Sequence, residues 1–175
     1  KLTAAGNDYD AVQKRVNEIV AKLDKIMTAC QQQADWMRNA KYAWESNPTI
    51  EKSKKKGTCV TYVACVLQRL GIEPSGKYVW HDENHKVYGN NDKMEVIYPN
   101  GKTLHQLKNE LSKGDIIMDG NKNDPGGGSH IFILTGKWDK NGNPTIWDNH
   151  SAQDKGGKSY VYTRNRPVIA IVRVK

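Results

Sequence analysis

The feature that most constrains the fold is a change of hydrophobic period partway along the chain. Residues 8–40 carry apolar side chains at steps of three and four, which predicts one long amphipathic helix. Asn7 or Asp8 can cap its N-terminus. A second helix is predicted at about residues 59–70, where Gly71 provides a natural stop. The first part of the chain is therefore helical.

Beyond Gly114 the pattern changes to short strands separated by turns rich in glycine and asparagine. The run Asp139-Lys-Asn-Gly-Asn143 predicts a hairpin connection. Helices followed by a meandering antiparallel sheet predict an α+β fold. We expect residues 1–46 to form a helical connector or packed element and residues 47–175 to form the main domain. Helix 104–111 precedes strands predicted at residues 116–118, 130–135, 145–149, 160–163 and 168–174, and two more candidates lie at residues 78–80 and 94–98.

The charge balance narrows the class of partner. A net charge of +8 favours a polyanion, either nucleic acid or an anionic cell wall or membrane surface. Only residues 52–56 form a dense basic run, and no zinc-finger or RNA-binding motif accompanies it. The chain has no apolar run long enough to cross a membrane. We therefore expect no nucleic acid partner and no membrane insertion. The absence of an initiator methionine suggests a fragment or a processed chain.

Three cysteines, Cys30, Cys59 and Cys65, form a sparse set without a Cys-x-x-Cys pair, which argues against a disulfide framework and a structural zinc site. Cys30 and Cys65 lie at core positions of the two predicted helices. Cys59 differs because it lies at a helix start, after Gly57 and a lysine-rich segment. The positive end of the helix dipole favours the reactive thiolate there. Cys59 is therefore the candidate nucleophile.

A histidine elsewhere in the chain can supply the base that a cysteine nucleophile requires. His130 follows a glycine-rich loop and opens an apolar strand. A third group should orient its imidazole, and the next strand offers Asp148 and His150 on one face. A tight turn would set His130 opposite Ala152 or Gln153, and a bulge would shift this register. A carboxylate suits an imidazolium better, so we favour Asp148 and keep His150 as the alternative.

Four segments together resemble a known family. Residues 57–72 (Gly-Thr-Cys-Val-Thr-Tyr-Val-Ala-Cys-Val-Leu-Gln-Arg-Leu-Gly-Ile) resemble the nucleophile helix of the CHAP and NlpC/P60 peptidoglycan hydrolases. Residues 111–118 are similar to their "pGDii" strand, and residues 129–136 and 141–151 to their histidine hairpin. The resemblance implies a papain-like cysteine peptidase fold.

Matched position by position, the resemblance makes Cys59 the nucleophile and His130 the general base. Asp148 then stands where CHAP members carry an acidic residue, while the histidine that NlpC/P60 members often use as third group keeps His150 open. The chain departs from both patterns, since Thr58 replaces a side-chain amide that is thought to help the oxyanion hole. The NlpC/P60 Asp-Cys-Ser-Gly signature is also absent.

The resemblance implies a cysteine hydrolase that cuts amide bonds in the peptide stems or cross-bridges of peptidoglycan, as an endopeptidase or an N-acetylmuramoyl-L-alanine amidase. Such a protein acts outside the cell or in the cell wall, as a phage endolysin, a mobile-element lysin or a bacterial autolysin. The alternatives are a thiol acyltransferase, a protein-directed cysteine peptidase such as a toxin, and a non-catalytic wall-binding module. We expect a monomer, or part of a larger multidomain chain, without a cofactor.

Two further patterns concern binding. Five tryptophans could include platforms for sugar stacking, and Trp80 and Trp147 are the better candidates for the groove. His81 and His85 are spaced as zinc ligands would be on a helix. The surrounding residues favour a loop or a strand instead, so we expect no metal site.

Overall fold

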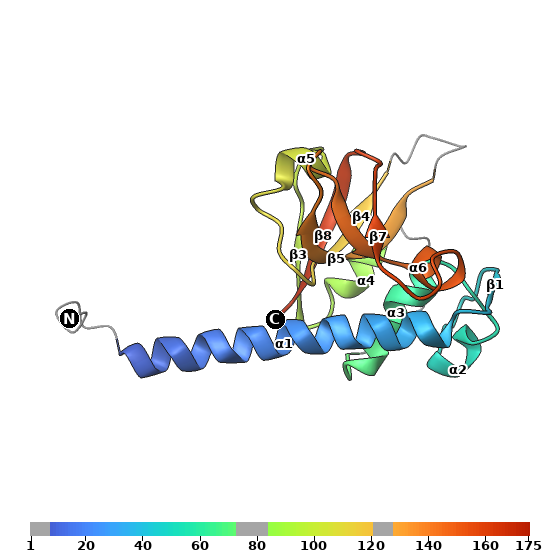
Figure 1. Cartoon of the computed structure of the whole chain (residues 1–175), viewed down its shortest axis with the longest axis horizontal. Coiled ribbons are helices and arrows are strands. Elements are labelled where there is room, and N and C mark those ends of the chain that lie inside the picture. The colour runs from blue at the N-terminus through green and yellow to red at the C-terminus, as the bar shows by residue number, and fades with distance from the viewer. Residues whose placement is uncertain (1–7, 73–83, 121–127) are drawn as a thin grey trace.

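The computed structural model describes residues 8–72, 84–120 and 128–175, which form helices packed on one antiparallel sheet (Figure 1). This arrangement confirms the α+β class. The helices are α1 (Tyr9–Trp36), α2 (Ile50–Ser53), α3 (Cys59–Arg69), α4 (Asn84–Tyr88), α5 (Leu104–Leu107) and α6 (Asn149–Gln153). The strands are β1 (Lys41–Tyr42), β2 (Lys56–Gly57), β3 (Met94–Ile97), β4 (Ile116–Asp119), β5 (His130–Trp138), β6 (Pro144–Trp147), β7 (Tyr160–Val161) and β8 (Val168–Val174).

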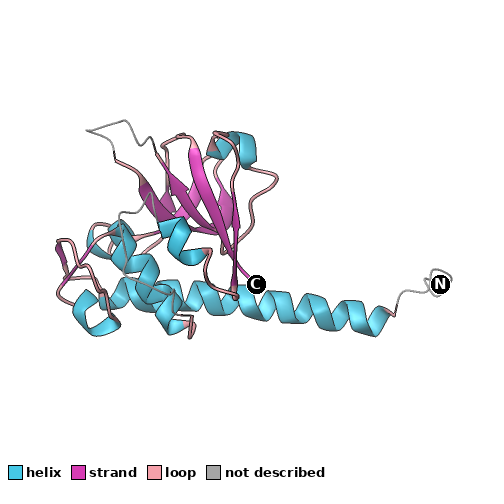
Figure 2. Ribbon diagram, turned by 180° about the vertical axis from the view of Figure 1, so that it is seen from behind, coloured by secondary structure: helices cyan, strands magenta, loops and turns pink. Residues whose placement is uncertain are grey.

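The long helix α1 has two different halves. Asp8 caps it as expected, because its Oδ1 accepts hydrogen bonds from the N–H groups of Asp10 and Ala11. The C-terminal half packs against α3 and α6 and is therefore a packed element of the main domain. The N-terminal half extends away from the sheet (Figures 1 and 2), and its apolar side chains Tyr9, Val12, Val16, Ile19 and Val20 are exposed.

The larger sheet has six strands in the order β3-β8-β4-β5-β6-β7, and every pairing is antiparallel. The expected meander describes β4 to β7. The last strand departs from it, because β8 returns to the middle of the sheet and pairs with both β3 and β4. This insertion buries the C-terminal strand on both edges.

Alternation along the strands gives the sheet two apolar faces. Ile131 and Ile133 of β5 belong to the core beneath α1 and α3, whereas Phe132 and Leu134 belong to a second core that includes the side chains of α5. The central strands are therefore buried on both faces. Their apolar runs in the sequence are explained by this double burial.

Of two further expectations, one falls outside the described residues and one is wrong. The strand candidate at residues 78–80 lies outside them. Residues 84–88 form the helix α4, where we expected a loop or a strand. Tyr88 at its end is completely buried, and this tertiary contact holds a segment whose local pattern is weak.

Candidate active site

Cys59 is the first residue of α3, and Thr58 is the N-cap. The apolar stripe of α3 faces the core, so the helix start is held rigidly beside the sheet. Gly57 makes this approach possible: a Cβ there would lie 2.7 Å from Met37 Cε and 2.8 Å from Thr61 Cγ2. Only glycine lets the chain pass from β2 into α3 so close to Met37 and Thr61. The position predicted for Cys59 is thus observed.

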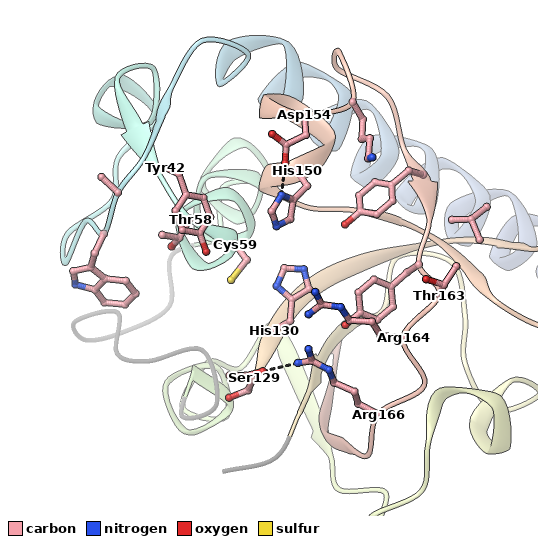
Figure 3. Close-up of a pocket in the computed structure, with 17 residues that line it drawn as sticks. Tyr42, Thr58, Cys59, Ser129, His130, His150, Asp154, Thr163, Arg164 and Arg166 are labelled. Atoms are coloured by element: carbon pink, nitrogen blue, oxygen red, sulfur yellow. Dashed lines mark hydrogen bonds and ion pairs between the residues drawn. The ribbon is translucent and has the colours of Figure 1, made fainter. Parts of the chain in front are cut away.

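His130 is the first residue of β5, and its backbone pairs with Asp119 of β4. Its side chain is close to buried. The imidazole turns its Nε2 to the Asp148 carboxylate, 2.7 Å from Oδ2, and lies next to the Cys59 side chain, whose charge acts on it. Figure 3 shows Cys59 and His130 facing each other across the pocket. The imidazole therefore connects a thiol and a carboxylate.

Asp148 follows β6 and caps α6, where its Oδ1 accepts a hydrogen bond from the Ser151 N–H. It is completely buried. Its Oδ2 accepts a second hydrogen bond from the Tyr160 hydroxyl at 2.8 Å. A buried carboxylate needs partners of this kind. Together with His130, they hold Asp148 in one orientation.

Burial and neighbouring charges shift the pKa values of His130 and Asp148. Burial alone lowers the pKa of His130, but the charge of Cys59 and the hydrogen bond to Asp148 outweigh it and raise that pKa to about 10. Burial alone raises the pKa of Asp148, and the hydrogen bond from His130 brings it below its usual value. The site therefore favours a charged imidazole beside an ionised carboxylate.

His150 takes a different partner. Its Nδ1 forms a hydrogen bond with the carboxylate of Asp154, which lies one helical turn further along the chain. Its ring stacks on Tyr42 with centroids 6.1 Å apart. Its ring centroid lies 6.0 Å from that of His130, and the two imidazoles form hydrogen bonds with different carboxylates. The geometry thus gives the orienting position to Asp148, and His150 becomes part of the pocket wall.

The end of β6 decides this choice, because the strand stops at Trp147 and Asp148 leaves it as the N-cap of α6. The hairpin begins with Trp138 paired to Pro144, but beyond the irregularity between Leu134 and Trp138 the register pairs Ile133 with Trp147. The tight-turn register, which set His130 opposite Ala152 or Gln153, is therefore wrong by two or three positions, because the observed register continued to His130 would reach His150. The shift that the bulge introduces brings the end of β6 to the start of β5.

Sequence reasoning missed the wall formed by β7 and the residues after it. Tyr162 stacks on His130 with centroids 5.9 Å apart, and its hydroxyl donates to buried Asp119 at 2.8 Å. Arg164 and Arg166 follow and line the same pocket. The alternation Tyr160-Val-Tyr162 could have indicated a shared face, but no local signal connects it to His130.

The pocket between these groups has a volume of about 710 Å³ (Figure 3). Trp44 lines it, whereas Trp147 is buried in the core and points to no groove. Trp147 therefore offers almost no exposed ring on which a sugar could stack. Trp80 and His81 lie outside the described residues. Among the residues that the structure describes, no cluster of histidine, cysteine or acidic side chains is suited to a metal ion.

Comparisons with known proteins give one match. Residues 1–20 match the family model of a CW_7 repeat, a cell-wall-associated repeat. This match associates the chain with the cell wall over that short segment. No curated protein and no solved structure matches the chain. In the described residues, no helix has the length and apolar character that crossing a membrane requires.

The comparisons also correct the expected family. The chain matches neither the CHAP nor the NlpC/P60 family, so the assignment to that superfamily is wrong. The quoted segments share a helix start and a histidine hairpin with those enzymes, and short patterns of this kind arise from general constraints on helices and hairpins. The chemistry that the site can perform therefore depends on its own geometry.

Proposed function

We propose that the chain is a cysteine hydrolase that cuts amide bonds in bacterial cell-wall peptides. One observation carries this proposal: His130 connects the Cys59 side chain with the buried Asp148. A nucleophile, a base and a group that orients the base are the parts that thiol-dependent acyl transfer requires. The proposed architecture is papain-like, with the thiol on a helix and the imidazole on an adjoining antiparallel sheet.

The cell wall is proposed as the target on two grounds. Residues 1–20 match a cell-wall-associated repeat, and a net charge of +8 suits an anionic wall. The pocket is wide enough for a peptide segment, because small-molecule sites typically occupy about 300–1,000 Å³. Its polar wall suits a peptide better than a lipid. We infer that the acyl group comes from a wall peptide stem or cross-bridge.

The reaction begins when the Cys59 thiolate attacks the amide carbonyl and a carbon–sulfur bond forms. The charge that develops on the carbonyl oxygen is stabilised by N–H groups at the start of α3. The Thr58 hydroxyl adds a donor, since its Oγ1 is buried, has no hydrogen-bond partner among the described residues and belongs to a pocket-lining residue. His130 then protonates the leaving amine as the carbon–nitrogen bond breaks.

The second half of the reaction releases the acyl group. His130, now neutral, accepts a proton from water, and the water oxygen attacks the thioester carbonyl. The carbon–sulfur bond breaks, the free carboxylic acid leaves, and the thiolate and imidazolium are restored. Asp148 stabilises the imidazolium throughout and keeps the imidazole in one orientation.

Purified cell-wall fragments test this function. The fragments are incubated with the protein and the products are identified by mass spectrometry, which also distinguishes an endopeptidase from an amidase. Cys59→Ala should abolish release of products. Cys65→Ala is the matched control, because Cys65 lies in the same helix but is buried in the core. Full activity of the Cys59→Ala protein would refute the proposal.

A further inference from the structure

We propose that Arg164 and Arg166 bind a carboxylate of the substrate next to the amide that is cut, so that the site selects anionic peptides. This inference rests on the proposed function, because it assigns the substrate class of the same pocket. It starts from the wall that follows β7, where two arginines lie within three residues.

The two guanidinium groups lie at the reacting end of the pocket. Both residues line it together with Cys59 and His130. In Figure 3 the arginine side chains reach from the segment after β7 toward His130 and Ser129. Any group that they bind must therefore lie close to the carbonyl that Cys59 attacks.

The charge of the pocket wall is unbalanced. Lys155 adds a third cation to the two arginines. The only carboxylate among the described lining residues is Asp154, and it is occupied by His150. Arg164 forms no ion pair with any described residue and is exposed, while Arg166 donates a hydrogen bond to the Gly128 carbonyl. An anion would complete this wall.

The two buried carboxylates beneath the wall, Asp148 and Asp119, form hydrogen bonds with other groups. Asp148 is occupied by His130, Tyr160 and Ser151. Asp119 accepts a hydrogen bond from Tyr162, and the arginines act on it only through longer-range attraction, which lowers its pKa against the larger, opposite effect of burial. Arg164 therefore faces the solvent side of the pocket as an available cation, and Arg166 adds positive charge to the same wall.

The backbone that carries the arginines is anchored at both sides. The Tyr162 N–H donates to the Pro144 carbonyl at 2.8 Å, and the Gly120 N–H donates to the Pro167 carbonyl at 3.0 Å. Between the two arginines, Asn165 Oδ1 accepts a hydrogen bond from the His105 N–H. A held segment loses less conformational freedom when a ligand binds. This anchoring makes the wall a preorganised site.

The chemistry of arginine indicates which anion fits. Its planar fork forms two parallel hydrogen bonds with a carboxylate or a phosphate. Because the arginines lie beside the reacting carbonyl, their ligand must belong to the peptide that is cut and cannot be a remote part of a wall polymer. Peptides carry carboxylates at their C-terminus and on acidic side chains. A free carboxylate close to the scissile amide is therefore the group that we assign to this wall.

Paired substrates test the assignment. Two soluble wall peptides are compared that differ only in one group near the scissile amide, a free carboxylate or the corresponding carboxamide. We expect the native protein to prefer the carboxylate by about 10- to 150-fold in kcat/KM, the range for loss of a charge-assisted hydrogen bond. In the double variant Arg164→Gln, Arg166→Gln the ratio should fall close to one. Arg164→Gln alone, at an exposed position, should lower the ratio without affecting folding.

Lys140→Gln is the matched control, because Lys140 is exposed on the turn between β5 and β6 and does not line the pocket. It removes one positive charge but should leave the ratio unchanged. Hydrolysis without preference, or a preference that persists in the double variant, would overturn the carboxylate site and leave the proposed function intact.

A binding measurement separates the two proposals. Calorimetric titration of the Cys59→Ala protein with the same peptides reports recognition without hydrolysis. Carboxylate-dependent binding that the arginine substitutions remove supports the inference even if the native protein hydrolyses neither peptide, a result that would refute the proposed function alone. If neither peptide is bound or hydrolysed, both proposals are wrong.

Discussion

Asp148→Asn separates the chemistry of the site from its structure, because asparagine keeps the size of the side chain and caps a helix as well as aspartate does. In the native protein the Asp148 carboxylate accepts hydrogen bonds from His130 and from Tyr160 through one oxygen. In the variant, an amide whose oxygen stays on the Ser151 N–H turns its NH₂ group to these two donors. His130 must then carry its proton on Nδ1, on the side of Cys59.

The expected loss of rate follows from these contacts. A charge-assisted hydrogen bond contributes about 1.5–3 kcal/mol, and about 1.4 kcal/mol corresponds to a tenfold change. Loss of the bond between His130 and Asp148 therefore slows the reaction by roughly 10- to 150-fold. The wrong tautomer adds to this, since general acid–base catalysis contributes about 10²–10⁴-fold. We expect kcat/KM to fall by about 10²–10⁴-fold in total.

The assay is the release of wall peptides, quantified by mass spectrometry at a fixed pH near 7, with circular dichroism to verify folding. The pKa of His130, followed by NMR, should also fall, because the carboxylate that raises it has gone. Asp154→Asn is the control: it removes the partner of His150 and leaves the partner of His130, so its effect should stay below about tenfold. A folded Asp148→Asn protein with near-native activity would refute the proposed triad.

Three further predictions concern the thiols, the helix start and the core. Iodoacetamide near neutral pH should label Cys59 first, since burial raises the pKa of Cys65 to about 11 and Cys59 lines the pocket; equal labelling of both, mapped by peptide mass spectrometry, would contradict this. Gly57→Ala should lower the free energy of unfolding by about 1–3 kcal/mol in urea titrations, because its Cβ overlaps Thr61. Burial raises the pKa of Asp119, so the folded state holds its proton more tightly than the unfolded state and stability falls as pH rises above about 4. Asp119→Asn should remove this decline in chemical denaturation at a series of pH values, and an unchanged decline would exclude Asp119 as its source.

The local elements could be read from the sequence because they depend on near neighbours. The stripe of α1, its Asp8 cap and the apolar run of β5 are patterns within one element. The same reasoning located Cys59 at a helix start. The resemblance to a known family, in contrast, rested on short segments and led to a wrong assignment.

The composition of the site was decided by the tertiary structure. The choice between Asp148 and His150 depended on where β6 ends and α6 begins, and the insertion of β8 beside β4 depended on pairing between distant segments. The burial of Trp147 and the arrival of Arg164 at the pocket depend on the same sheet order. Strand register and sheet order arise from contacts between residues far apart in the chain, which no local period encodes. The sequence alone therefore located the candidate thiol and the candidate imidazole, and only the folded chain decided which groups surround them.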